Sequence, residues 1–355
     1  MRSETHARHP YENPIRVARH ALGLRLPLRR RRSATRATKF EAKALVSIRR
    51  LHDITARGQV VENTFWLTLP NEYKSVAYRS QNPDLASMTD AQLLDHFERF
   101  GRTEGRTANR LHDRRSFSRL VPKTANVLEI GPFCAPLLRG PNVSYFDVLT
   151  EEQLTARAKL HGLDPTGIPH IDYVSPTGDL GVVDRYFDFA ISSHCLEHQP
   201  DLIHHLQQVR NILKPDGAYL ALIPDKRYCF DHFIPISNLA EILAAHYERR
   251  KVHSLRSVLE HRALITHNDA SRHWSDDHGR MFDNVIARVE AALQEFRNSN
   301  GTYLDVHAWY FTPESACDII SELRSTGIIN FNVAKLYSTR LNTLEFWLVL
   351  RAVSD

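Results

Sequence analysis

The sequence predicts an α/β fold: a seven-stranded, mostly parallel sheet with helices on both faces and an antiparallel last strand. Strand-like and helix-like segments alternate over residues 126–224, a pattern typical of strands that lie parallel in one sheet. The alternation stops over residues 226–311, which we expect to be a mostly helical insertion after the fifth strand. Two strand-like segments end the chain with no room for a helix between them, so they should pair antiparallel.

The first elements each have a local signal. Apolar residues mark buried strands at 127–130 and 143–148. A Thr-x-x-Gln capping box at Thr150 begins a helix that ends near His161. A short third strand is expected at 171–174.

The later elements are signalled more strongly. Residues 186–192 have the most strand-like composition in the chain, and leucine and valine recur at helical spacing over 201–213. A Lys-Pro-Asp-Gly run ends that helix before a fifth strand at 218–223. The remaining expected elements are helices near 237–250, 254–265 and 280–297, a helix from Thr312-Pro313 to about Arg324, and strands near 328–336 and 344–351.

The charge is distributed unevenly along the 355 residues. The net charge is +5, yet residues 1–45 carry 12 Arg or Lys against three Glu, so the rest of the chain is slightly acidic. A protein that grips nucleic acid should carry positive charge on its catalytic face, so we find no strong nucleic-acid signal. We expect 1–45 to be a basic, disordered tail. The alternatives to a tail without a function are contact of Arg29–Arg32 with anionic surfaces and a role as a transit peptide.

Two further classes are disfavoured by composition. No run of 18 or more apolar residues is present, so no membrane-spanning helix is expected. The four cysteines are far apart and form no Cys-x-x-Cys pair, which fits a reducing compartment, and we expect a cytoplasmic protein.

Acidic residues stand at the tips of two successive strands, Glu129 and Asp147. In an open α/β sheet the ligand lies beyond the carboxyl ends of the strands, where an acid can accept hydrogen bonds from ribose hydroxyls. A glycine at position 131 lets the backbone approach such a ligand. With its acid-x-Gly run Glu129-Ile130-Gly131, the segment resembles the first motif of the class I S-adenosylmethionine-dependent methyltransferases.

This resemblance spans about residues 120–352 and implies a Rossmann-like sheet with S-adenosylmethionine (SAM) as cofactor. Phe133 and Ala135 stand where the family commonly has further glycines, and the short connection to Val143 implies a truncated or irregular first crossover helix. By resemblance, Glu129 faces the amino acid end of SAM, and Asp179 with Leu180 faces the adenine. The expected cofactor-binding residues are Glu129, Gly131, Pro132, Phe133, Asp147, Asp179, Leu180 and Ser193.

The segment from Phe187 to Asp225 carries the most specific pattern: Phe-Asp, a strand, a polar turn ending in Leu-Glu-His, a helix, Leu-Lys-Pro-Asp-Gly and a strand. It resembles methyltransferases that act on small molecules or lipids. By resemblance, His198 lies at the mouth of the cofactor pocket, where an imidazole can act as general base on a hydroxyl. Capping of the next helix is an equally good role for it. His194 is the second candidate base.

Residues 46–118 are expected to form a small helical module before the main domain, 119–355. Thr89 is a suitable N-cap for a helix that ends at Gly101. The segment 76–106, with its Asn-Pro-Asp-Leu and Gly-Arg-x-Glu-Gly-Arg runs, resembles a short helical module found beside bacterial glycosyltransferase and methyltransferase domains. The resemblance implies a glycan-related context, and simple packing on the main domain is the alternative.

The insertion 226–311 has the composition of a substrate lid, because Asp, His, Trp and Tyr concentrate in segments that follow a catalytic strand. The expected lid residues are Asp225, Asp231, His232, His273, Trp274 and Asp277, with His278 as a further catalytic candidate. Asp and His can ligate a divalent ion, as His194 and His307 also can. No recognised metal spacing is present, so we expect no metal and a hydrogen-bonded polar network instead.

These observations lead to one preferred function. The sequence predicts a methyltransferase that uses SAM to methylate a hydroxyl of a small-molecule or glycan acceptor, with a histidine as general base. A catalytically inactive binding or scaffold protein of the same fold is the first alternative, favoured by the altered glycine motif. A metal-dependent hydrolase is the second, favoured only by the 20 histidines.

Overall fold

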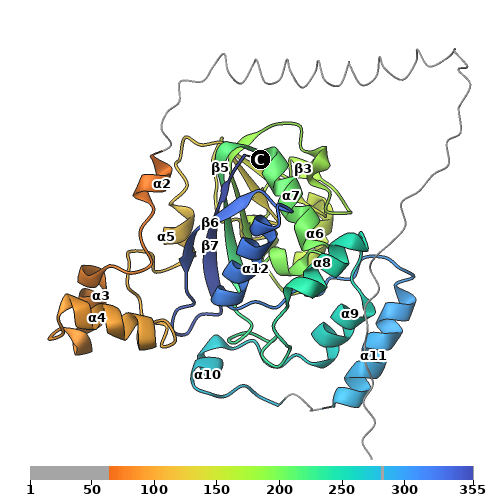
Figure 1. Ribbon diagram of the computed structural model, residues 1–355. Coiled ribbons are helices and arrows are strands. Elements are labelled where there is room, and N and C mark those ends of the chain that lie inside the picture. Colours follow the sequence, from red (N-terminus) through yellow and green to blue (C-terminus); the bar gives the residue numbers. More distant parts are fainter. Residues whose placement is uncertain (1–63, 281–283, 355) are drawn as a thin grey trace, which may run out of the picture. The chain divides into compact units, whose positions relative to one another are not determined.

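The computed structural model describes residues 64–280 and 284–354, in which helices surround a central sheet (Figure 1). The sheet has seven strands in the order β3-β2-β1-β4-β5-β7-β6. Neighbouring strands pair in parallel, except that β7 is antiparallel to both β5 and β6. The predicted fold class is therefore confirmed. The strands are β1 (Val127–Ile130), β2 (Val143–Asp147), β3 (Tyr173–Val174), β4 (Phe187–Ser193), β5 (Leu213–Pro224), β6 (Phe331–Tyr337) and β7 (Glu345–Ala352).

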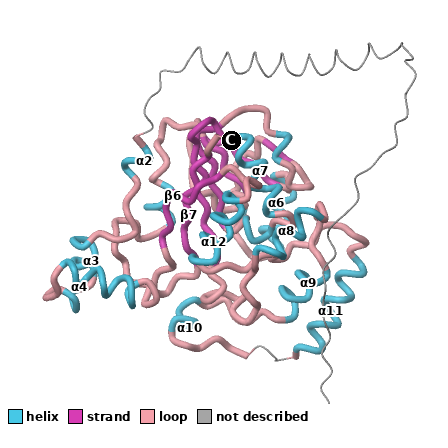
Figure 2. Tube along the Cα trace, in the orientation of Figure 1, coloured by secondary structure: helices cyan, strands magenta, loops and turns pink. Residues whose placement is uncertain are grey.

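Apolar side chains fill both faces of this sheet. One face packs Leu128 and Tyr219 against helices α7 (Leu202–Ile212), α8 (Leu239–Tyr247) and α12 (Pro313–Ser325). On the other face, Val127, Phe189 and Trp347 pack against residues around α2 (Phe65–Thr68) and α5 (Arg114–Ser118). Chain segments that precede β1 in the sequence thus cover this second face of the sheet (Figure 2).

The expected helix signals act as predicted where they fall in the described part. Thr150 caps α6 (Glu151–Leu160) through a capping box with Gln153. Thr312 caps α12 in the same way, with Pro313 at the first helical position. The short connection between β1 and β2, residues 131–142, contains turns and no helix, in agreement with the spacing.

Two expectations on the elements were wrong in detail. The third strand spans only two residues, because Ile171 turns into a small cluster with Tyr145 and Leu154 before the pairing begins. A short helix, α10 (Ala270–Trp274), lies between the helices expected near 254–265 and 280–297, where no helix was expected, and Asp269 caps it.

The part before β1 also contains a separate small core. Tyr78, Leu85, Leu93 and Phe97 are buried together. They come from α3 (Ser75–Gln81), η1 (Pro83–Leu85), α4 (Asp90–His96) and the π-helical turn η2 (Phe97–Gly101). The expected tail, residues 1–45, lies outside the described residues.

The described residues of the insertion fold as four helices joined by long loops: α8, α9 (Leu255–Ala263), α10 and α11 (Val285–Asn298). Helices α9 and α11 pack side by side (Figure 1) around Val258, Ala292 and Val306. No helix in the described part of the chain is long and apolar enough to cross a membrane.

Candidate active site

The two strand-tip acids are buried but have different partners. Glu129 is 2% exposed, and its two carboxylate oxygens accept the backbone N–H groups of Leu137 (2.6 Å) and Leu138 (3.0 Å). Burial raises its pKa to about 7, although these hydrogen bonds oppose the rise. Glu129 therefore fixes the irregular connection after β1. Asp147 accepts the N–H of Leu149 at 3.0 Å, and burial raises its pKa too, although backbone hydrogen bonds oppose the rise.

The backbone beside these acids is open to a ligand. Gly131 has φ +71°, and a Cβ built there would meet no atom within 4 Å. Phe133 also has a positive φ, of 45°, so two residues of this turn adopt the left-handed conformation. Pro132 between them is buried, and Ser193 at the tip of β4 is half-buried. The turn therefore leaves open space beside the Cα of Gly131.

The pair expected near the adenine lies in a short turn after β3. Asp179 is exposed and accepts the N–H of Gly181 at 2.8 Å, which caps the turn η4 (Leu180–Val182). Leu180 is 1% exposed and packs in the main core. Its side chain thus faces the core.

His198 lies in the turn η5 (Leu196–His198), which directly follows β4. Its Nδ1 is 3.0 Å from Oδ1 of Asp305, at the end of the insertion. Burial lowers the pKa of His198, but the close contact with the Asp305 carboxylate and the charges of the other nearby carboxylates outweigh burial and raise it. The contacts of Asp305 with His198 and with Arg157 on α6 outweigh its burial and lower its pKa.

A buried carboxylate accompanies this pair. Glu197 is fully buried, and neither of its carboxylate oxygens has a hydrogen-bond partner among the described residues. Its Oε1 lies 3.9 Å from Nε2 of His198 and 3.9 Å from Nδ1 of His194. Buried polar groups are rarely left unpaired, so this side chain points to a group that binds here.

A second Asp–His pair stands beside the first. Nδ1 of His307 is 2.6 Å from Oδ2 of Asp231, and both residues are buried. The rings of His198 and His307 meet edge to face, with centroids 4.6 Å apart and planes at 87°. The backbone N–H of His307 donates to Nδ1 of His261.

His194, the other candidate base, belongs to a different network. It has φ +51° at the tip of β4, and its Nε2 lies 2.8 Å from Oε2 of Glu345, at the start of β7. Arg114 also binds Glu345, at 2.5 and 2.9 Å, and Trp347 donates to it at 3.0 Å. Burial raises the pKa of Glu345, but the hydrogen bonds from His194 and Arg114 outweigh burial and lower it to about 2.

The expected lid residues have varied surroundings. Asp225 is fully buried at the end of β5, where Arg227 and the hydroxyl of Thr339 bind it. Trp274 stacks on Tyr228, with centroids 3.8 Å apart and an interplanar angle of 4°, and its Nε1 donates to the carbonyl of Thr343. Asp277 is exposed and pairs with Arg272 at 2.8 Å.

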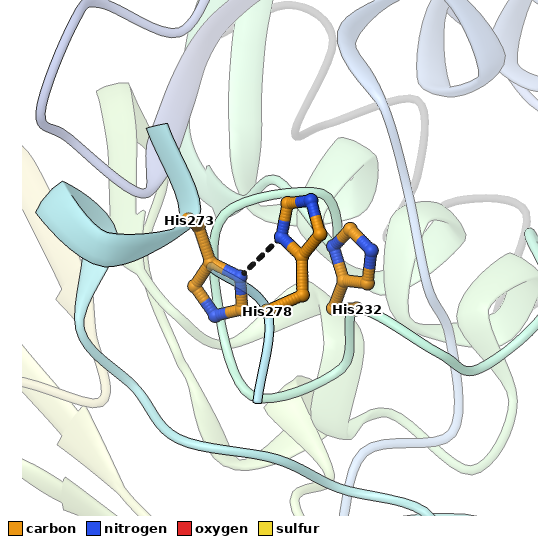
Figure 3. Close-up of side chains that lie close together, drawn as sticks. All are labelled: His232, His273 and His278. Atoms are coloured by element: carbon orange, nitrogen blue, oxygen red, sulfur yellow. Dashed lines mark hydrogen bonds between the residues drawn. The ribbon is translucent and has the colours of Figure 1, made fainter. Parts of the chain in front are cut away.

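Three histidines of the insertion, His232, His273 and His278, lie together in one cluster (Figure 3). The rings of His232 and His278 stack, with centroids 3.7 Å apart, and Nδ1 of His273 is 3.1 Å from Nδ1 of His278. His278, which was expected to be catalytic, is thus grouped with His232 and His273.

Within residues 64–280 and 284–354, three groups of side chains have donor atoms close enough to hold a metal ion. In each group, one potential ligand atom per residue lies within 4.8 Å of the others. The groups are Glu197 with His198 and His307, Asp231 with His261 and His307, and His232 with His273 and His278.

The structure therefore brings His198 and Asp231 into one cluster, beside Glu197, Asp305 and His307. The sequence prediction named neither Glu197 nor Asp305 as site residues. Glu197 is the middle residue of the Leu-Glu-His run and could have been found there. Asp305 lies more than 100 positions away, and its only signal is the acid before His307 in the segment that ends the insertion.

A family model described as a methyltransferase domain matches residues 100–284, just over half of the chain. No protein of curated function matches the chain.

Solved structures with a similar fold include three methyltransferases. A SAM-dependent methyltransferase from Methanosarcina mazei is 14% identical, over 66% of this chain and 95% of its own, with a TM-score of 0.33. The CcbJ methyltransferase from Streptomyces caelestis is 10% identical, over 68% and 94%, with a TM-score of 0.36. An O-methyltransferase family protein from Burkholderia thailandensis is 15% identical, over 82% and 67%, with a TM-score of 0.32. None of these likenesses bears on the substrate.

Proposed function

Because the chain belongs to the methyltransferase domain family and is a SAM-dependent methyltransferase, we propose that it methylates a hydroxyl of a small-molecule or glycan acceptor, with His198 as general base. The pairing of His198 Nδ1 with Asp305, 3.0 Å away and beside the tip of β4, carries this proposal. A methyl group on the SAM sulfonium is already activated for in-line displacement. The protein then has to orient the acceptor and remove its proton.

His198 has the features of a base for an alcohol. Asp305 can only accept a hydrogen bond when ionised, so the neutral imidazole carries its proton on Nδ1 and presents the lone pair of Nε2. When Nε2 takes the proton of the acceptor hydroxyl, the charge of Asp305 and that of Glu197 stabilise the resulting imidazolium. A higher pKa makes the imidazole a stronger base, which suits a weakly acidic alcohol.

Two neighbouring histidines have lowered pKa values, in contrast to His198. Burial lowers the pKa of His253 to about 4 and that of His261 to about 2. Such imidazoles stay neutral and are weak bases, although His261 accepts the N–H of His307 and so helps to orient it. Within this cluster the charge distribution favours protonation at His198.

We also propose that SAM is held at the open turn after β1, with Asp147 accepting hydrogen bonds from the ribose. The free space at Gly131 and the burial of Asp147 support this. For Glu129 we propose an indirect role, since both oxygens already bind Leu137 and Leu138 and thereby shape the turn.

We propose that a cavity of about 1050 Å³, whose lining includes no residue of the His198 cluster, binds part of a glycan acceptor. It is lined by residues of the Asn-Pro-Asp-Leu and Gly-Arg-x-Glu-Gly-Arg runs, including Asp84 and Arg106, and by Trp274 of the insertion. Amides, carboxylates and guanidinium groups with an aromatic ring suit a ligand with many hydroxyls and apolar ring faces. We therefore keep the proposal that segment 76–106 is the module that occurs in glycan-related proteins.

The test measures cofactor binding and methyl transfer separately. SAM and S-adenosylhomocysteine binding is followed by calorimetry, and transfer of a labelled methyl group is followed against panels of sugars, glycosides and small alcohols. His198→Ala should keep cofactor affinity and reduce turnover about 10²–10⁴-fold, the usual contribution of a general base. His204→Ala, an exposed histidine on the following helix, is the matched control and should be neutral. Unchanged turnover in His198→Ala would overturn the assignment of the base, and transfer to amines but not to alcohols would overturn that of the acceptor.

A further inference from the structure

Three histidines of the insertion meet although they come from separate segments (Figure 3). His232 follows β5, His273 ends the short helix α10, and His278 lies in the turn after it. His273 is 2% exposed, whereas the other two are half-buried. This cluster is separate from the two Asp–His pairs beside β4.

One nitrogen of each ring is already engaged with an oxygen that cannot donate a proton. Nδ1 of His232 is 2.8 Å from the carbonyl of Arg227, and Nε2 of His273 is 3.1 Å from the carbonyl of His267. Nε2 of His278 is 3.1 Å from a carboxylate oxygen of Asp276. Each of these nitrogens must therefore carry the hydrogen, which leaves a lone pair on the other nitrogen of the neutral ring.

The nitrogens with lone pairs are the ones that come together. Nδ1 of His273 and Nδ1 of His278 are only 3.1 Å apart, and the ligand atoms of all three rings lie within 4.8 Å of one another. Two lone pairs that face each other repel unless a proton or a metal ion lies between them, so this pair of nitrogens is a place for either. Imidazoles that bind a metal typically donate their other N–H to a carbonyl or carboxylate, which is the arrangement of all three rings.

We propose that His232, His273 and His278 bind a divalent transition-metal ion of the kind that prefers imidazole, such as Zn²⁺. Four ligands at about 2.1 Å in a tetrahedron are about 3.4 Å from one another, close to the His273–His278 separation. His232 and His278 now stack with an interplanar angle of 12°. Their rings have to turn about χ2, a broad torsion, to converge on one ion. The fourth position is left for water or another ligand.

The ion would join two parts of the insertion. His273 and His278 belong to the segment 266–279, and His232 belongs to the segment 225–234, which also carries Asp231 toward His307. Binding would therefore hold the loop that orients the second Asp–His pair. The site itself does not depend on the identity of the methyl acceptor. The sequence predicted no metal because a separation of 40 residues between His232 and His273 matches no local motif.

The experiment uses the full chain without a histidine tag, stripped with a chelator and then titrated with Zn²⁺ by calorimetry. Metal content after dialysis is measured by elemental analysis. We expect about one Zn²⁺ per chain, and Co²⁺ in its place should give the visible absorption of a low-coordinate site. His278→Gln should weaken binding at least 10-fold. Because His278 is half-buried, this variant should fold, which circular dichroism and SAM binding check on the same sample. His204→Ala, exposed on α7, is the control for general histidine binding.

Three results would overturn the proposal. The wild-type chain could take up no Zn²⁺, or His278→Gln could bind it as tightly as the wild type does. Zinc could also remain in His278→Gln but be lost in Glu197→Gln, which would locate the ion beside His198. Methyl transfer by the stripped enzyme is a separate readout, so loss of the metal proposal leaves the proposed reaction untouched.

Discussion

Replacing Asp305 by asparagine tests how His198 becomes a base. Asparagine keeps the shape of the side chain but removes the negative charge 3.0 Å from Nδ1 of His198. An opposite charge at this distance shifts a pKa by about 1–3 units, so Asp305→Asn should lower the pKa of His198 by that amount. Other groups around His198 stay in place. They are Glu197, Asp231, His253, His261 and His307.

The sign of the effect on the pH profile follows directly. Catalysis needs the neutral imidazole, so kcat/KM falls as the pH drops through the pKa of His198, which lies above 6.5 in the folded protein. In Asp305→Asn the fall should begin about 1–3 pH units lower. The rate on the plateau should also fall, because the weaker and less oriented base takes the proton less well.

Nuclear magnetic resonance of histidine-labelled protein measures this pKa without an acceptor. The chain has 20 histidines, so the resonances of His198 are identified by their loss in His198→Asn. Asp188→Asn is the matched control, since Asp188 is likewise in an ion pair, with Lys214, and both aspartate side chains are 34% exposed. Asp188 lies near the start of β4, at the opposite end of the strand from the site. An unchanged His198 pKa in Asp305→Asn, with an unchanged fold, would refute the reasoning.

Three further predictions concern the cofactor, a buried ion pair and the core. Asp147→Ala should weaken SAM binding about 10–100-fold in calorimetry, since a hydrogen bond to a charged group is worth about 1.5–3 kcal/mol; unchanged affinity would exclude a ribose contact. The pKa of Glu345 is lowered to about 2, so its stabilisation is present above pH 4.5 and lost as the pH falls towards 2. In urea unfolding at neutral pH, the free energy of unfolding of Glu345→Gln should therefore be about 3 kcal/mol below that of the wild type. This difference between the two proteins should disappear as the pH falls towards 2. A difference that stays constant with pH would contradict the prediction. Leu206→Ala, fully buried in the main core, should lower the free energy of unfolding by about 2–5 kcal/mol, and a loss below 1 kcal/mol would mean that α7 packs loosely.

The sheet could be predicted because its signals are local. Strand composition, the capping boxes at Thr150 and Thr312, and the Lys-Pro-Asp-Gly turn each act over a few residues. The parallel pairing follows from the alternation, and the antiparallel pairing of the last two strands follows from the lack of space for a last crossover. The helix α10 was missed, since its five residues are too few for a periodic pattern and only the capping Asp269 marks its start.

The site could be predicted only in part, because its interacting residues are close in space but far apart in the sequence. The Leu-Glu-His run identified His198, but nothing near it in sequence points to Asp305 as the partner of its Nδ1. Likewise His194 has a base-like position at a strand tip, whereas its partners Arg114 and Glu345 lie 80 positions before it and 151 positions after it. Composition showed that the insertion is rich in Asp and His, but it could not separate the Asp–His pairs from the cluster of three histidines.

The insertion has to be folded before the proposed base can act. Asp231 stands near its first residue, and Asp305 and His307 stand near its last, yet all three gather at His198 after β4. Backbone contacts reinforce this closure, since the carbonyl of Glu197 accepts the N–H of Ala308 at 2.7 Å. Without a folded insertion, the core sheet with Asp147 would still bind the cofactor, but His198 would lack its contact with Asp305. Variants that loosen the insertion should consequently lose turnover while retaining SAM affinity, which is the opposite of the pattern expected for Asp147→Ala.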